Sequence, residues 1–384
     1  MAQESTPPEQ RPGTLLSYVR RRLETFSQRG LCPVDSLVLS CLAYTQVPPE
    51  AELAGLRLRD WEGVPLRELY RAEYFQQYYA GLLIEPYGLR LLAAAAASPR
   101  FRDLLVRGYR EHTDHQAQEQ FAAVTFQVEP GLHFVAYRGT DASLVGWKES
   151  FNLSFCCPVP AQSDAAAYLE EVAQQVDGEL VVGGHSKGGN LAVYAAACAP
   201  GAIQERIKQV FSHDGPGFLP EFLETDAYAR VAEKTSKTVP QASVVGLLLE
   251  DRERHQVVRS KNALIWQHDP FSWVVEGCDF AYLDSLAPSA RLVSSTVSAW
   301  LRSRSAEERE RFINTLYAVL ETAGAQSTQD LREGSWRNAP AVARAFAGLD
   351  PETRSFTLQT LAALLPLGIK AVPGLGKSAT GSPA

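Results

Sequence analysis

The sequence predicts an α/β fold in which a mostly parallel central sheet has helices on both faces. The main observation is that short apolar β-prone runs alternate with segments of helical spacing through the middle of the chain, a pattern typical of βαβ units. The composition, with 45% hydrophobic and 21% charged residues, is that of a globular protein with an ample core. At 384 residues, the chain is long enough for one large domain and a smaller appendage.

The N-terminal part is expected to be mainly helical. Residues 1–13 are polar and predict a disordered tail. Residues 14–30 and 34–45 have the apolar spacing of helices, and so do residues 66–110, which end in a basic segment. These segments predict a helical extension ahead of the sheet.

The middle of the chain supplies the predicted strands. Asp164 is expected to cap a helix that leads to the second strand, and a helix of small residues over 190–198 follows that strand. Residues 218–239 form either a cap over a binding pocket or an ordinary packed helix. The predicted strands cover residues 132–137, 180–182, 207–211, 243–249 and 263–266.

Beyond residue 280 the pattern is helical only, and Ser305 with Glu308 predicts a capping box. We expect a main domain over residues 14–282, with its core at about 34–280. A helical appendage over 283–370 and a disordered tail over 371–384 would follow. The appendage is either packed on the domain, which we favour, or a partner-binding element.

Charge and cysteine usage limit the function classes. A net charge of −7 without a basic block argues against a nucleic-acid partner. The six cysteines are scattered without metal-ligand spacing, and we expect neither a metal nor an organic cofactor. Because we find neither a secretory signal nor a transmembrane stretch, we expect a cytoplasmic protein. The sequence does not fix the oligomeric state.

Residues 184–188 (GHSKG) match the G-x-S-x-G pattern between a predicted strand and a predicted helix. A serine at the apex of such a strained turn needs small neighbours, and the start of the helix places main-chain N–H groups beside its hydroxyl. The alternative is a glycine-rich turn that packs tightly or binds phosphate, but the phosphate-loop spacing is absent. Ser186 is therefore the candidate nucleophile.

The segment GGHSKGGNLAVYAA resembles the elbow of lipase-like α/β-hydrolases, and Tyr137-Arg138-Gly139-Thr140 resembles the aromatic-R-G-S/T segment of fungal-type class 3 lipases. Trp147 and Glu149 extend this second likeness. The resemblance covers about residues 34–280 and is strongest to a bacterial family of lipase-like proteins. It implies an α/β-hydrolase fold with helical N- and C-terminal extensions.

Two main-chain donors are expected to stabilise an oxyanion. The N–H of Lys187, directly after the nucleophile, is the first. The resemblance implies Thr140 as the second, through its N–H and also its hydroxyl. The alternative for residues 138–140 is a plain turn at a strand end with a solvated Arg138.

The fold places the acid and then the histidine after the nucleophile in the chain. His213 adjoins an acid candidate and is expected to point away from it. His268 follows a predicted strand and is favoured as the base, whereas His255 lies in a charged run and is the alternative. For the acid, Asp214 resembles the placement in pancreatic-type lipases.

Glu250 and Asp251, after the next predicted strand, are the competing acids, and Asp214 as a structural turn residue is a third interpretation. The acid would hold the imidazole of the base in the correct tautomer.

The sequence and the resemblance together predict a serine hydrolase. It would cleave carboxylic esters, as an esterase or lipase-like acyl hydrolase, through an acyl-enzyme, and its substrate would be a small ester or a lipid. A thioesterase, peptidase or acyltransferase of the same fold is the first alternative. The second is a non-catalytic relative that binds partners through its C-terminal helices.

Overall fold

The computed structural model describes residues 13–322 apart from residues 81, 83, 142, 253 and 254, together with 343–344, 346–351, 353–355 and 357. Of the expected N-terminal tail, only Gly13 is described, and it pairs with Val275. The expected C-terminal tail lies outside the described residues, and so does most of the expected helical appendage beyond residue 322.

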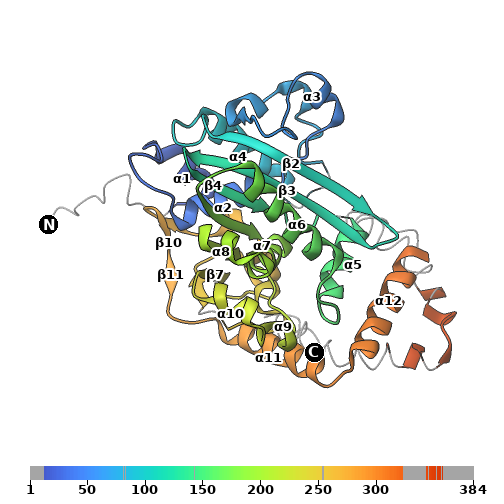
Figure 1. Cartoon of the computed structure of the whole chain (residues 1–384). Helices are drawn as coiled ribbons and strands as arrows, with labels where there is room; N and C mark the ends of the chain where they lie inside the picture. The colour runs from blue at the N-terminus through green and yellow to red at the C-terminus, as the bar shows by residue number, and fades with distance from the viewer. Residues whose placement is uncertain are drawn as a thin grey trace, which may run out of the picture.

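A mixed sheet runs through the described part of the chain (Figure 1), with the strand order β1-β2-β3-β4-β5-β6-β7-β8-β11. The strands β4 to β8 run parallel to one another, and the strands at both edges run antiparallel. The parallel strands are β4 (Leu132–Tyr137), β5 (Glu179–His185), β6 (Ile207–His213), β7 (Thr235–Pro240) and β8 (His255–Val258). The antiparallel strands are β1 (Val64–Pro65), β2 (Leu105–Asp114), β3 (Glu119–Glu129) and β11 (Tyr282–Leu283), of which β1 and β11 form the two edges. A separate hairpin joins β9 (Val275–Glu276) to β10 (Asp279–Phe280).

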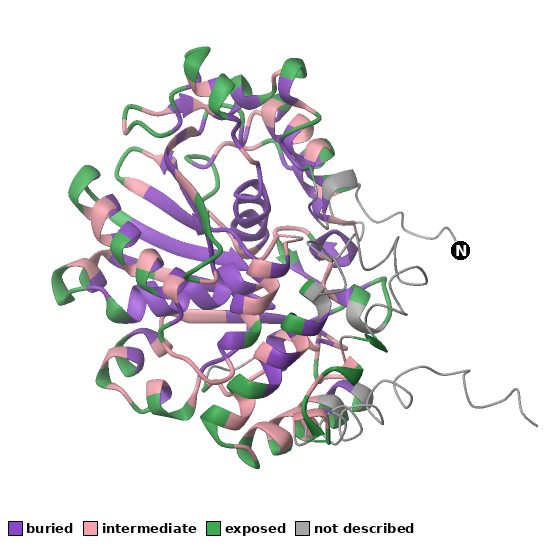
Figure 2. Ribbon diagram, turned by 90° about the vertical axis from the view of Figure 1, so that its right-hand side faces the viewer, coloured by how far each residue is buried: buried purple, intermediate pink, exposed green. Residues whose placement is uncertain are grey.

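Successive residues of each strand point to opposite faces of the sheet. Because both faces carry apolar side chains, helices cover both of them. Phe134 of β4 packs into the core with α1 (Leu15–Arg21), α2 (Pro33–Leu42) and α4 (Glu85–Ala97). The next residue, Val135, packs with the helices of the other face. Those are α6 (Pro160–Gln175), α7 (Lys187–Cys198) and α10 (Asp226–Ala232). Figure 2 shows the buried residues along the strands and the helices that cover them.

The remaining helices lie around this three-layered core. The short helices are α3 (Pro49–Leu53), α8 (Gly201–Arg206) and α9 (Pro220–Leu223). Helix α5 (Leu144–Asn152) follows β4, and the C-terminal part forms α11 (Pro288–Arg302) and α12 (Ala306–Thr322). The predicted capping box is confirmed, since Ser305 N donates to Glu308 Oε2 at 2.9 Å and Glu308 N donates to Ser305 Oγ at 3.2 Å.

Helix α12 packs its apolar face against α5. Phe312, Ile313 and Tyr317 form a small core with Leu144, and the ring of Tyr317 also contacts Phe151 at 6.3 Å between centroids. The C-terminal helices thus include a packed contact with the segment that follows β4. Among the described residues, no helix combines the length and apolar character needed to cross a membrane.

Several sequence predictions of elements are confirmed and others are wrong. The strands at 132–137, 180–182 and 207–211 are confirmed. Residues 243–249 and 263–266 are not strands, because they contain the 3₁₀ turns Val245–Leu247 and Leu264–His268. The strands β7 and β8 occupy those places in the sheet instead.

The N-terminal predictions also need correction. The helix expected over 14–30 ends at Arg21, and residues 105–110 belong to β2 rather than to a helix. β2 pairs with β3, a strand that was not predicted. Asp164 does not cap α6, because that helix begins at Pro160.

Residues 218–239 contain the packed helices α9 and α10 rather than a cap. Leu223, Tyr228 and Val231 are buried in the same core as α7. This core contact gives the segment a structural role in which its apolar side chains are already covered.

Candidate functional site

Ser186 lies at a strained turn between β5 and α7, with φ 60° and ψ −134°. A positive φ is costly for a residue with a side chain, so the surrounding structure must hold it in place. Glycine makes the turn possible: a Cβ on Gly184 would lie 2.2 Å from the carbonyl carbon of Gly188, and one on Gly188 would lie 2.1 Å from Tyr137 O. The predicted turn is present, and Ser186 is half-buried at its apex.

The structure brings Ser186, His268 and Asp214 into one hydrogen-bonded series. His268 Nε2 lies 2.9 Å from Ser186 Oγ, and His268 Nδ1 lies 2.6 Å from Asp214 Oδ2. The Asp214 carboxylate accepts a hydrogen bond from Nδ1–H, which leaves the Nε2 lone pair to accept a hydrogen bond from the serine hydroxyl. The His268 side chain is 22% exposed, whereas that of Asp214 is fully buried.

The second carboxylate oxygen of Asp214 is held by the segment after β7. Ser243 Oγ donates to Asp214 Oδ1 at 2.5 Å, and Gly246 N donates to the same oxygen at 3.1 Å. Asp214 itself adopts a left-handed conformation, with φ 50°, directly after β6. Ser243 was not identified from the sequence, because its contact joins segments far apart in the chain.

The competing acids lie in other interactions. Asp251 Oδ1 lies 2.6 Å from His255 Nε2, and Asp251 Oδ2 accepts from Lys237 Nζ at 2.6 Å. Burial raises the pKa of Asp251, but His255 and Lys237 outweigh it and leave that pKa below its usual value. Glu250 is paired with Arg302 at 3.2 Å. His255 and Asp251 are thus brought together with each other, while the Ser186 hydroxyl contacts His268.

A second histidine, His185, contacts His268. The Nε2 atom of His185 donates to the carbonyl oxygen of His268 at 2.9 Å, and the two rings lie 4.7 Å apart. Tyr44 donates to the Nδ1 atom of His185 at 3.3 Å. Burial, together with the charge of His268, lowers the pKa of His185 well below its usual value, so this imidazole is neutral. Tyr44 was not identified from the sequence, because it lies 141 residues before His185 in the chain.

His213 points away from the site, as expected from its position beside Asp214. Its Nε2 atom lies 2.7 Å from Ser36 Oγ of α2, and its ring contacts Trp273 at 6.3 Å between centroids. Burial lowers the pKa of His213 to about 3. The side chain is therefore a neutral part of the core.

Of the residues expected to form an oxyanion hole, Lys187 directly follows Ser186, and Thr140 follows Gly139, which approaches the same turn. Lys187 is the first residue of α7, where main-chain N–H groups lack an acceptor within the helix. Gly139 packs against the turn, since a Cβ there would lie 3.0 Å from the Cβ of Ser186. The Thr140 hydroxyl lies 2.6 Å from Ser150 Oγ, so its main-chain N–H is the group left to donate.

Arg138 is buried rather than solvated, contrary to the alternative interpretation of this turn. Its guanidinium pairs with Glu111 at 2.5 Å and lies 4.0 Å from Asp141. These charges fix the turn between β4 and α5. The Lys187 side chain is buried as well, and its ammonium is paired with Glu149 at 2.6 Å.

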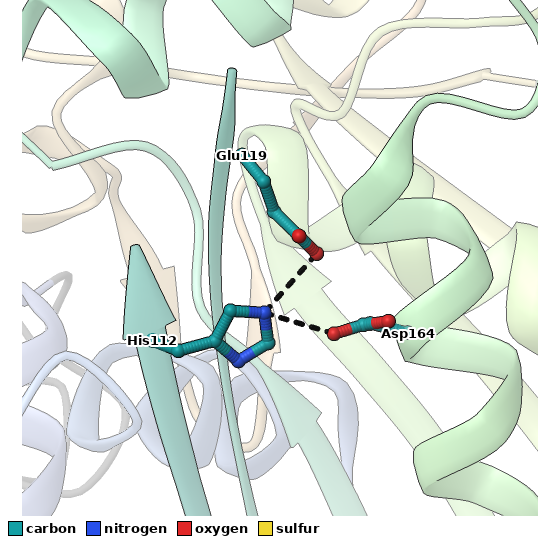
Figure 3. Close-up of side chains that lie close together, drawn as sticks. All are labelled: His112, Glu119 and Asp164. Carbon is teal, nitrogen blue, oxygen red and sulfur yellow. Dashed lines mark ion pairs between the residues drawn. The ribbon is translucent and has the colours of Figure 1, made fainter. Parts of the chain in front are cut away.

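His112, Glu119 and Asp164 form the one cluster of metal-ligand atoms found among the described residues (Figure 3). His112 Nε2 lies 3.2 Å from Glu119 Oε1 and 2.9 Å from Asp164 Oδ2. Burial and the charge of Asp164 raise the pKa of Glu119. The direct contacts of the His112 imidazole with the two carboxylates account for this arrangement, and we assign no metal to it.

The family of the chain follows from a comparison with known families. The profile of the Mbeg1-like family matches residues 95–318, which is more than half of the chain and includes the site just described. The chain belongs to the Mbeg1-like family. The match also runs through α11 and into α12, beyond the boundary at residue 282 that the sequence predicted. No curated protein matches the chain.

Solved structures that are similar to the chain include several lipases. One is a fungal lipase in complex with an inhibitor, at 14% identity and a TM-score of 0.35, covering 66% of this chain and 89% of that one. A triacylglycerol lipase described as having a serine protease triad is similar at 15% identity and a TM-score of 0.34, covering 58% and 77%. The Rhizomucor miehei lipase–propeptide complex is similar at 11% identity and a TM-score of 0.33, covering 73% and 90%.

The predicted α/β-hydrolase fold is confirmed for this Mbeg1-like protein. The parallel strands β4 to β8, the strained serine turn after β5 and an aspartate, Asp214, directly after β6 follow one another in the order of this fold.

Proposed function

We propose that this protein is a serine hydrolase that cleaves carboxylic esters, with Ser186 as nucleophile, His268 as base and Asp214 as the acid. One observation carries the proposal: Ser186 Oγ, at the apex of a strained turn, lies 2.9 Å from His268 Nε2. This distance is within hydrogen-bond reach of a general base. A buried carboxylate on the other imidazole nitrogen further supports these roles.

The reaction follows from this geometry. His268 Nε2 takes the Ser186 proton while Oγ attacks the ester carbonyl carbon, and the carbonyl oxygen becomes an oxyanion that the N–H groups of Lys187 and Thr140 stabilise. The imidazolium, stabilised by Asp214, then protonates the leaving alkoxide, and the C–O bond breaks to leave an acyl-serine. Water, deprotonated by the same imidazole, attacks the acyl-serine and releases the carboxylic acid.

A small-molecule or lipid ester is the proposed substrate class, supported by the family to which the chain belongs. A cytoplasmic location remains a prediction from the sequence. No residue of the proposed mechanism calls for a metal or an organic cofactor.

Hydrolysis of p-nitrophenyl esters tests the proposal. Acetate, butyrate, octanoate and palmitate esters separate an esterase from a lipase-like enzyme. We expect turnover by the wild-type protein, none above background by Ser186→Ala, and wild-type rates for Ser163→Ala, which changes an exposed serine of α6. Absence of turnover by the wild-type protein on every ester, or equal turnover by Ser186→Ala, would contradict the proposal.

A further inference from the structure

Helix α5 contacts the start of α7, directly after Ser186, through the side chain of Glu149. Glu149 Oε2 accepts from Lys187 Nζ at 2.6 Å and from Gln120 N at 3.1 Å, and Glu149 Oε1 accepts from Ala161 N at 2.9 Å. The carboxylate therefore joins β3, the start of α6 and the first residue of α7. Its side chain is 0% exposed.

The buried Lys187 ammonium has a hydrogen-bond acceptor for each of its protons. Besides Glu149, it donates to Gln120 O at 2.5 Å and to Gln120 Oε1 at 3.2 Å, which occupies all three of its N–H bonds. The Lys187 side chain is 1% exposed. A buried charge without its partner is strongly destabilising, so this pair strongly favours one position of Lys187. The main-chain N–H of the same residue is the proposed first oxyanion donor.

The next residue of α5, Ser150, contacts the other side of the site. Ser150 Oγ donates to Gly146 O at 2.9 Å, which uses its single proton. Thr140 Oγ1, 2.6 Å away, is therefore the donor in the bond between the two hydroxyls. This bond fixes the side chain of Thr140, whose main-chain N–H is the proposed second oxyanion donor.

We propose that Glu149 and Ser150, consecutive residues of α5, are positioning residues that fix the two proposed oxyanion donors relative to each other. Glu149 fixes Lys187 through the buried ion pair, and Ser150 fixes Thr140 through its hydroxyl. The inference rests on the proposed ester hydrolysis. Oxyanion donors act only when aimed at the position where charge develops, and small displacements are costly. One rigid helix therefore sets the spacing of both donors.

The test compares variants that keep Ser186, His268 and Asp214 intact. Ser150→Ala removes the anchor of Thr140, and Ser150→Thr restores a hydroxyl. Asn152→Ala is the matched control, because Asn152 lies on the same helix and loses one side-chain bond, to Gln118 at 3.1 Å. The paired variant Glu149→Gln with Lys187→Met removes both buried charges together, which avoids leaving one unpaired.

The measurements are kcat and KM for p-nitrophenyl butyrate, the pH dependence of kcat, and inhibition by phenylboronic acid, which forms a tetrahedral adduct with a nucleophilic serine. For Ser150→Ala we expect kcat to fall by about 10-fold or more, and for the paired variant by about 100-fold, toward the loss caused by removing one oxyanion donor. KM and the pH midpoint of kcat stay at wild-type values, and the affinity for the boronic acid falls with kcat. Ser150→Thr and Asn152→Ala stay within about threefold of wild type.

Folding is checked by near-UV circular dichroism, and the Ser150 series decides the matter if the paired variant does not fold. Ser150→Ala with wild-type kcat, or with the same loss as Asn152→Ala, would overturn the inference. A loss confined to KM or to a shifted pH midpoint would also overturn it. A wild-type protein without turnover or boronic-acid binding would instead refute the ester hydrolysis itself, and the inference with it, before any variant is compared.

Discussion

Replacing Asp214 by asparagine tests how the site sets the protonation of its histidine. Asp214 Oδ1 accepts hydrogen bonds from Ser243 Oγ at 2.5 Å and from Gly246 N at 3.1 Å. An amide at this position must therefore direct its oxygen toward those donors, since the opposite orientation would place its NH₂ group against them, and a buried donor left unsatisfied costs roughly 1–3 kcal/mol. The NH₂ group then faces His268.

The magnitude follows from the resulting tautomer. Nδ1 of His268 must then accept a hydrogen bond from the amide, so the imidazole proton moves to Nε2. A protonated Nε2 faces Ser186 and cannot accept the hydroxyl proton. For such a reversal we expect kcat to fall by about 10,000-fold, or about 5.5 kcal/mol of transition-state stabilisation. The fold should be unchanged, because asparagine has nearly the same shape as aspartate.

The assay is the initial rate of p-nitrophenyl butyrate hydrolysis, with circular dichroism to verify folding. Asp251→Asn is the control, since Asp251 also contacts a histidine at 2.6 Å, namely His255. We expect that variant to retain kcat and to lose thermal stability, because Lys237 is left buried without its partner. An Asp214→Asn protein with more than a tenth of wild-type kcat, beside an inactive Asp251→Asn protein, would refute the reasoning.

Three further predictions concern the turn, the core and a thiol. Gly188→Ala would place a Cβ 2.1 Å from a main-chain oxygen, and we expect urea unfolding to show a loss of about 2 kcal/mol or more. His213 has a pKa of about 3 in the folded protein, so below pH 6.5 the unfolded chain binds more protons. Its contribution to stability falls on acidification by about 1.4 kcal/mol per pH unit, and His213→Gln should lessen that slope in urea titrations from pH 7 to pH 4. A hydrogen bond from Cys32 lowers the pKa of Cys278 to about 6, so alkylation of Cys278 by iodoacetamide should reach half its maximal rate near that pH.

Each of these predictions has an internal control. Gly201→Ala meets no atom within 4 Å of the added Cβ and should leave stability unchanged. Burial raises the pKa of the Cys198 thiol, so its alkylation should require a more alkaline pH than that of Cys278. Equal stability losses in the two glycine variants would contradict the first prediction. A wild-type acid slope in His213→Gln, or matching pH profiles for the two thiols, would contradict the second or the third.

The serine turn was predictable because its constraints are local. Only glycine fits at positions 184 and 188, and a buried strand enters the turn, so sequence pattern and backbone geometry carry the same information. Three of the five parallel strands, β4, β5 and β6, were predicted for the same reason. Strands such as β4 are continuous apolar runs.

His268 was selected for a reason that the structure does not support. Residues 263–266 do not form a strand, and His268 ends a 3₁₀ turn instead. Its position is set by His185 and by the bond from Trp273 Nε1 to Gln267 O at 2.8 Å. Such contacts join distant parts of the chain and leave no local pattern.

The strands β2 and β7 were missed because their sequences are polar. β7 includes Lys237, which is buried only because Asp251 neutralises it. β2 ends in a run of polar and charged residues next to the edge strand β1, and its arginines reach partners on other elements, as Arg110 does to the Arg59 carbonyl at 2.9 Å. The roles of Ser243 and Tyr44 likewise depend on tertiary contacts.

Labelling with a fluorophosphonate, followed by mass spectrometry of the digested protein, tests most directly whether the Ser186 hydroxyl is made nucleophilic by the imidazole that lies 2.9 Å away. We predict one phosphonyl group, on the peptide that contains Ser186, and labelling at least about 100-fold slower in His268→Ala. No adduct on the folded wild-type protein, or an adduct on another residue, would contradict the account.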